Sequence, residues 1–385
     1  MRILYLLFTM VCFVRANTLL PPSDFLGYKL GDKFTPHHLV VDYLFHVSQN
    51  EPNVKIIEYG KTYEGRPLML AFISSVDNMD KLEQIRKDNL TRAGIIKGST
   101  KTKKVGIVWL SYNVHGNEAN STEAAMKTLH ALADKSNIAT QEWLKNTVVI
   151  IDPSVNPDGR DRYANWYRMT ANRWPDADPL GREHMEPWPG GRTNHYYFDL
   201  NRDWAWQTQI ESQQRIIKYN EWLPHIHVDF HEQGYNSPYF FAPAAKPLHQ
   251  YITDWQRDFQ KTIGLNHAKY FDRNNWLYFT KESFDLLYPS YGDTYPTYNG
   301  AIGMTYEQAG HSRGGLAIET EDGDTLTLAD RLEHHYTTGL STIEVASKNV
   351  EKMVNEFSDF FNPNRKELVD TFKSYVITRS NPTDK

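Results

Sequence analysis

Strand-like runs of apolar residues recur along the chain. They occupy residues 54–59, 68–73, 105–110, 147–151, 225–231 and 300–306. The first two flank a turn at Glu64-Gly65, and the run at 147–151 is apolar throughout. Short runs rich in β-branched residues predict strands, and fully apolar runs predict strands that are buried on both faces.

Helix-forming segments lie between these runs. They occupy residues 36–49, 77–90, 121–135 and 328–361. Ser121 or Thr122 is expected to cap the third of these helices. Strands that alternate with helices predict an α/β protein, with a mixed central β-sheet flanked by helices on both faces as an α/β/α sandwich.

The first 16 residues form a separate unit. Arg2 precedes an apolar stretch that is too short to span a bilayer, and Val14-Arg15-Ala16 is interpreted as the cleavage site, with the small residue Ala16 at its end. This pattern predicts a signal peptide cleaved after Ala16, and hence a secreted or periplasmic protein. No repeat or linker interrupts the remainder, so residues 17–385 are expected to form a single catalytic domain.

The composition of the chain excludes several classes of protein. The 385 residues are 40% hydrophobic and 23% charged, which is typical of a globular enzyme-sized chain. The net charge of −5 argues against a nucleic-acid partner, and no segment after the signal peptide has the length and apolarity of a membrane span. The single cysteine, Cys12, lies in the signal peptide, so no disulfide is expected. The oligomeric state is left open.

Polar residues follow the predicted strands. His115 and Glu118 come after the run at 105–110, with Gly116 between them to let the backbone bend. Their spacing suits either two ligands of one metal ion or a polar surface loop. Other polar groups follow later strands, at residues 152–159, 199–204, 231 and 307. Because ligands bind at the carboxyl ends of parallel strands, these clusters predict one active site.

The order of the motifs carries a family resemblance. The chain contains His115-Gly-Asn-Glu118, Asn156-Pro-Asp-Gly159, Asp199-Leu-Asn201-Arg202-Asp203-Trp204, His231, Tyr288 and Glu307. In this order and spacing, from about residue 36 to 350, the sequence resembles the zinc carboxypeptidases of the carboxypeptidase A type. His231-Glu-Gln-Gly resembles the bacterial branch that has HE-[MQ]-G at the third zinc ligand.

The resemblance implies a role for each matching residue. His115, Glu118 and His231 would hold one zinc ion per chain and leave a position for water, which is typical of a catalytic site. Asp199 would orient the ring of His115, although capping of a turn is an alternative role. Glu307 would act as general base on the attacking water and return the proton to the leaving amine.

Further residues would bind the substrate. Asn201 and Arg202 would hold a free C-terminal carboxylate, and Tyr288 would close over the substrate, with Tyr291 and Tyr295 as nearby alternatives. The family also has an arginine that stabilises the oxyanion. Arg162, Arg168 and Arg173 all follow the Asn156-Pro-Asp-Gly159 motif at a suitable distance, and Arg168 is preferred.

Several features do not follow the family pattern. Residues 174–197 form a polar, turn-rich segment that is expected to lie over the cleft and narrow substrate choice. His184 and His195 in this segment are poor ligand candidates, and His225 and His227 are expected to be structural. No role is predicted for Glu232. Asp293 favours a basic terminal side chain and Tyr295 an apolar or small one, so the preferred terminal residue is left open.

These features predict a zinc metallocarboxypeptidase that acts on peptides with a free C-terminal carboxylate. The alternative is a zinc amidase of the same fold that acts on peptidoglycan stem peptides or N-acyl amino acids. A catalytically dead binding module is disfavoured because every ligand and the catalytic Glu307 are present.

Overall fold

The computed structural model describes residues 18–365. The predicted signal peptide and Cys12 lie outside the described residues. A central sheet of eight strands has the order β1-β2-β4-β3-β5-β10-β6-β8. Its four middle strands run parallel to one another, namely β4 (Thr147–Asp152), β3 (Gly106–Tyr112), β5 (Ile226–Gln233) and β10 (Ile302–Ala309). Their carboxyl ends therefore meet at one edge of the sheet.

Antiparallel pairs flank this parallel centre. On one side β1 (Val54–Lys61) pairs with β2 (Pro67–Ile73), which pairs with β4. On the other side β6 (Tyr239–Phe240) pairs antiparallel with β10 and parallel with β8 (Tyr278–Phe279). Two small ribbons complete the strands, formed by β7 (Ala245–Leu248) with β9 (Asp285–Leu286) and by β11 (Ala317–Glu319) with β12 (Thr325–Thr327).

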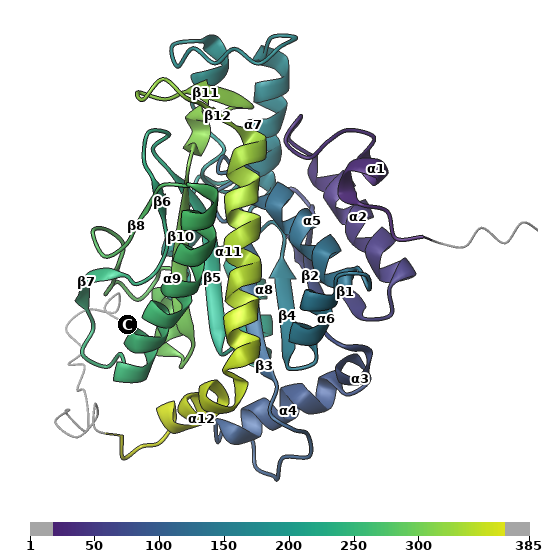
Figure 1. Ribbon diagram of the computed structural model, residues 1–385, viewed down its shortest axis with the longest axis vertical. Helices are drawn as coiled ribbons and strands as arrows, with labels where there is room; N and C mark the ends of the chain where they lie inside the picture. Colours follow the sequence, from purple (N-terminus) through teal and green to yellow (C-terminus); the bar gives the residue numbers. More distant parts are fainter. Residues whose placement is uncertain (1–17, 366–385) are drawn as a thin grey trace, which may run out of the picture.

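Helices cover both faces of the sheet. One face packs against α2 (His37–Asn50), α5 (Asn120–Ala133), α9 (Asp254–Asn274) and α11 (Leu328–Lys348), which lies along the length of the molecule in Figure 1. The other face packs against α4 (Leu82–Arg92), α8 (Ile210–Trp222) and α12 (Val350–Phe360).

The two faces have separate cores because side chains alternate along a strand. In β3, Val108 and Leu110 belong to one core, whereas Ile107 and Trp109 belong to the other. The α/β sandwich predicted from the sequence is therefore confirmed.

Shorter helices connect these layers. They are α1 (Pro22–Leu26), α3 (Val76–Met79), α6 (Ile138–Leu144), α7 (Pro157–Thr170) and α10 (Thr294–Tyr298), with 3-10 turns η1 (Arg182–His184), η2 (Leu200–Arg202) and η3 (His311–Arg313). Within residues 18–365, no helix combines the length and the apolarity that crossing a membrane requires.

Three expectations about helices were wrong in detail. The segment at 77–90 forms two helices, because Ser75 caps the short α3 and a new helix begins after Lys81. The segment at 328–361 is interrupted at Asn349, which ends α11 and precedes α12. Finally, α5 begins one residue earlier than predicted, after Ala119, and has no side-chain cap.

Candidate metal centre and active site

The loop after β3 is shaped by Asn113. This residue has a φ of 57°, a left-handed conformation that asparagine tolerates better than most residues. Its side-chain amide donates hydrogen bonds to the carbonyl oxygens of His115 (2.8 Å), Gly116 and Glu118 (3.1 Å). The loop is thereby folded back on itself, so the side chains of His115 and Glu118 meet.

Gly116 is required for close packing. A methyl group there would lie 2.2 Å from the backbone nitrogen of Arg160 and 2.4 Å from the carbonyl oxygen of Gly191. The Asn156-Pro-Asp-Gly159 motif supports the same contact, because the Asn156 side chain caps α7 and donates to the carbonyl of Arg192 at 3.2 Å. The motif thus joins the loop at residues 113–118, which we call the metal loop, to the segment at 174–197.

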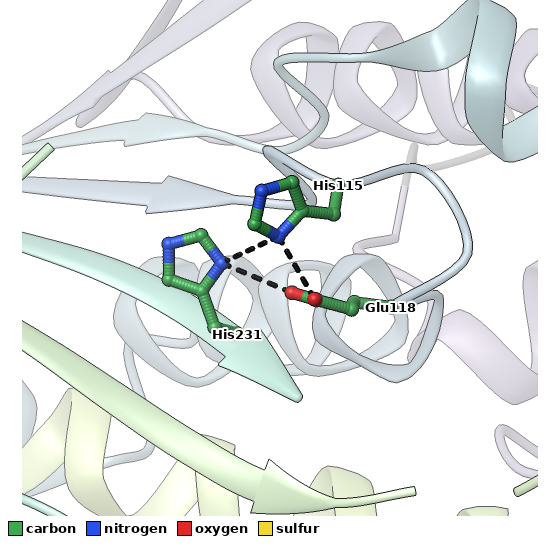
Figure 2. A group of neighbouring side chains, drawn as sticks. All are labelled: His115, Glu118 and His231. Atoms are coloured by element: carbon green, nitrogen blue, oxygen red, sulfur yellow. Dashed lines mark hydrogen bonds and ion pairs between the residues drawn. The ribbon is translucent and has the colours of Figure 1, made fainter. Parts of the chain in front are cut away.

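His231 reaches this loop from β5, the parallel neighbour of β3. Its Nδ1 lies 2.9 Å from Glu118 Oε2 and 3.2 Å from His115 Nδ1, and His115 Nδ1 lies 2.8 Å from Glu118 Oε1 (Figure 2). The candidate ligand atoms all lie within 4.8 Å of one another, and all three residues are buried. Two imidazole nitrogens and a carboxylate oxygen that converge in this way fit zinc, which favours N and O donors and keeps an open position in catalytic sites.

Asp199 lies behind the first of these ligands. Its Oδ1 is 3.0 Å from His115 Nε2, the ring nitrogen that faces away from the cluster. Burial opposes ionisation, but the hydrogen bond and charge interaction with His115, together with Arg192, hold the pKa of Asp199 well below its usual range. The structure therefore places Asp199 where an orienting carboxylate has to lie.

Glu307 lies within β10, opposite His231 of β5 in the parallel register. The strand continues to Ala309, so Glu307 is not at its end as the sequence indicated. Burial, and secondarily the charge of Glu118, raise the pKa of the Glu307 carboxyl to about 8, although His231 opposes the shift. A carboxyl group with a raised pKa beside the cluster is suited to proton transfer near neutral pH.

A cavity of about 350 Å³ opens onto these groups. Its walls include the predicted residues His115, Glu118, Asn201, Arg202 and Glu307. The remaining lining residues are Arg192, Glu232, Gln233, Phe284, Asp285, Tyr291, Asp293 and Thr305. Two of the three candidate ligands, the candidate general base and the candidate carboxylate-binding pair therefore border one space.

Four predicted site residues do not line this cavity among the described residues. His231 and Asp199 contact the lining residues Glu118 and His115, whereas Arg168 and Tyr288 make their contacts elsewhere. Arg168 lies on the last turn of α7, about 16 Å along the helix from its start near the metal loop, and its guanidinium bonds to the carbonyl of Phe34. Tyr288 accepts a hydrogen bond from the Trp206 indole at 2.9 Å and packs beside Tyr291. Tyr291, one of the alternatives weighed from the sequence, lines the cavity instead.

Arg192, rather than Arg168, is the arginine that reaches the metal cluster. It donates to Asp199 Oδ2 at 3.0 Å and to Glu118 Oε1 at 3.3 Å. The helical position of Arg168 directs it toward the carbonyl of Phe34 and away from the cluster, whereas the segment at 174–197 brings Arg192 to the cavity wall. Sequence reasoning missed Arg192 because it assigned this whole segment to substrate selection, although the Gly190-Gly191 pair before it signals close backbone packing.

The other polar residues have structural partners. Glu232 forms a buried ion pair with Arg331 of α11 at 2.9 Å and also accepts from the backbone of Asn120. The ring of His184 bonds two backbone carbonyls at 2.6 Å, and His195 pairs with Glu64 at the surface. Neither of these two histidines joins the cluster of candidate ligands.

Comparisons with solved structures recover the same fold at low sequence identity. A carboxypeptidase A from Helicoverpa armigera gives a TM-score of 0.54 at 17% identity, over 87% of this chain and 79% of that one. A metallo-carboxypeptidase from Pseudomonas aeruginosa gives 0.54 at 12% identity, over 82% and 68%. Bovine thrombin-activatable fibrinolysis inhibitor gives 0.53 at 14% identity, over 84% and 99%.

Comparison at the sequence level gives the family. The search of curated proteins finds no match. The family model described as zinc carboxypeptidase matches residues 40–266, which is more than half of the chain and includes His115, Glu118 and His231. The family model, the shared fold and the cluster of zinc-compatible donors lead to the same assignment. The chain belongs to the zinc carboxypeptidase family of metal-dependent peptide hydrolases.

Proposed function

We propose that this protein is an exopeptidase that removes the C-terminal residue of peptides. The observation that carries the proposal is the presence of Asn201 and Arg202 in the same cavity as Glu307 and the metal cluster. The guanidinium of Arg202 lies 4.5 Å from the centre of the Tyr291 ring, and its side chain is 46% exposed, so it remains accessible to a ligand. A planar guanidinium beside an amide matches a free carboxylate.

Two side chains of the cavity, Glu307 and Arg192, would act together with a bound zinc ion. When bound, zinc polarises the scissile carbonyl and lowers the pKa of a water molecule. Glu307 takes a proton from the attacking water and then gives it to the nitrogen of the leaving residue. Arg192 presents its guanidinium to the same cavity and stabilises the negative charge that develops on the carbonyl oxygen.

Asp293 supports a preference for a basic terminal residue. This side chain is 5% exposed and lines the cavity, and it forms no ion pair within residues 18–365. Burial raises the pKa of its carboxyl to about 6, against the opposing hydrogen bond from Thr294. A cation from the substrate would relieve the cost of burying this charge, and Asp285 lines the same cavity.

The test compares peptides that differ only at the C-terminus. A peptide that ends in Lys or Arg with a free carboxylate should be cleaved fastest, a peptide that ends in Phe more slowly, and the C-terminal amide least. Arg202→Ala should lower kcat/KM for the free acid about 10- to 100-fold, as expected for loss of a charge-assisted contact, and should affect the amide much less. Equal cleavage of acid and amide by the wild type would contradict the proposal. Cleavage of wall-derived amides alone would favour the amidase.

We also infer that the protein is exported. This inference rests on the basic, apolar and small-residue pattern of residues 1–16 alone. N-terminal sequencing of the protein made in its native host should begin at Asn17, whereas retention of Met1 would contradict export by this route.

A further inference from the structure

One face of β5 is polar, although the strand lies in the middle of the sheet. His227, Asp229 and His231 alternate along this face, whereas Val228 and Phe230 point into the apolar core on the other side. Asp229 is completely buried. Burying a carboxylate costs free energy unless a nearby group pairs with its charge or donates a hydrogen bond to it. The position of Asp229, two residues before the candidate ligand His231, therefore calls for an explanation.

The ring of His231 needs an acceptor on the side away from the cluster. Its Nδ1 faces Glu118 and His115, and Figure 2 shows its second nitrogen, Nε2, turned away from them. A neutral imidazole that offers Nδ1 to a metal ion carries its hydrogen on Nε2. Because His231 is 1% exposed, this N–H has to find its acceptor within the protein.

Asn201 cannot provide that acceptor. Its side-chain nitrogen Nδ2 lies 3.3 Å from His231 Nε2, but an amide nitrogen is a donor. Turning the amide over would bring its oxygen to His231, yet that oxygen already accepts from the backbone N–H of Gly292 at 2.8 Å. The Gly292 contact therefore fixes the orientation of Asn201.

Asp229 has an oxygen available in the right place. Its Oδ1 is held by His227 Nε2 at 2.7 Å, whereas Oδ2 has no hydrogen-bond partner in the part of the chain that the structure describes. Oδ2 lies 3.7 Å from His231 Nε2, slightly beyond hydrogen-bond length. A small rotation of either side chain closes this gap.

Gly292 makes room for this carboxylate. A methyl group on Gly292 would lie 1.6 Å from Asp229 Oδ2 and 2.7 Å from the indole nitrogen of Trp204. A side chain at this position would displace the carboxylate from His231. Gly292 thus leaves the space that the Asp229 carboxylate occupies, and its N–H donates to the side-chain oxygen of Asn201.

We propose that Asp229 is the positioning residue of His231. By accepting the Nε2 hydrogen, it fixes the tautomer and the ring orientation in which Nδ1 faces the metal, as Asp199 does for His115. Second carboxylates of this kind raise the basicity of a histidine ligand and its affinity for metal. The assignment deepens the proposed function, because it rests on zinc binding at the same cluster.

The experiment measures metal binding separately from peptide cleavage. The zinc dissociation constant, obtained by chelator competition, should rise about 10- to 100-fold in Asp229→Ala, and Asp229→Asn should recover part of the loss because its amide oxygen can accept. The visible absorption bands of the cobalt-substituted protein should shift in Asp229→Ala. With peptide substrates, kcat should fall while KM changes little, because the substrate contacts remain.

The matched control is Asp88→Asn. Asp88 is a buried carboxylate of α4 that accepts from the backbone N–H groups of Lys101 at 2.8 Å and Thr102 at 2.6 Å, on the other face of the sheet from α5 and α11. This variant should keep the zinc dissociation constant and the cobalt spectrum of the wild type. An equal loss in Asp88→Asn would show a general effect of core disruption and would overturn the proposal.

A second variant covers the case in which Asp229→Ala fails to fold. Gly292→Ala should also weaken zinc binding, because its methyl group displaces Oδ2. Wild-type zinc affinity and an unchanged cobalt spectrum in Gly292→Ala would overturn the proposal. If the wild type binds zinc but cleaves no peptide, the proposed exopeptidase activity fails, while the metal measurements still decide the role of Asp229.

Discussion

His267 makes the stability of this protein sensitive to acid. It lies on α9 with no exposed surface, where its Nδ1 is 2.7 Å from the hydroxyl of Ser341 on α11. The rings of Phe241 and Tyr306 meet it edge to face. Burial lowers the pKa of His267 to about 3. The folded protein therefore holds this imidazole neutral at pH 5 and above.

The sign and size of the effect follow from linkage. The pKa of a histidine in the unfolded chain is about 6.5, so the unfolded state takes up a proton first as the pH falls. The stabilisation is fully present above that value and is lost progressively as the pH falls toward the folded-state pKa. Between pH 7 and pH 5, this single group should lower the free energy of unfolding by about 2 kcal/mol.

Urea unfolding of the wild type and His267→Gln at these two pH values measures the effect. Glutamine can still bond Ser341 but does not titrate, so the variant should be less stable at pH 7 and should lose about 2 kcal/mol less than the wild type by pH 5. Excess chelator in every sample removes the contribution of zinc. The exposed His38→Gln is the matched control and should follow the wild type at both pH values. A difference between His267→Gln and wild type that stays constant with pH would refute the reasoning.

Further predictions concern the active site. Glu307→Gln should lower kcat about 10²- to 10⁴-fold, the usual contribution of a general base, while zinc still binds one per chain by metal analysis; near-normal turnover would exclude Glu307 as the base. Arg192→Ala should lower kcat about 10²-fold with a smaller change in KM, and Arg168→Ala should leave both constants unchanged; the reverse result would restore the interpretation made from the sequence. Asp199→Ala should weaken zinc binding about 10- to 100-fold in chelator competition, and unchanged affinity would show that it only caps its turn.

Much of the fold could be predicted because its strands are short apolar runs that the sheet buries on both faces. The apolar runs at 105–110 and 147–151 could not lie exposed to water, and both form central strands of the sheet. Helix interruptions were missed because they depend on local turns. The residues on both sides of Asn349 keep helical spacing, so the hydrophobic pattern continues across the break.

The site was predictable where a residue follows a strand and less so where it lies on a long loop. His115 and His231 are brought together by the pairing of β3 with β5, which strand order makes possible. Arg192 depends on the path of the segment at 174–197, which no periodicity encodes. Asp229 could have been found from the sequence, because alternation places it on the same strand face as His231.

The most direct test of the account is a mass-spectrometric time course of one peptide that ends in two lysines. The account predicts that the wild-type protein releases single residues from the C-terminus. It also predicts that excess chelator stops the release, that added zinc restores it, and that Glu307→Gln with bound zinc is inactive. Internal cleavage, release from the N-terminus, or an undiminished ladder in the chelated protein would contradict a zinc-dependent carboxypeptidase.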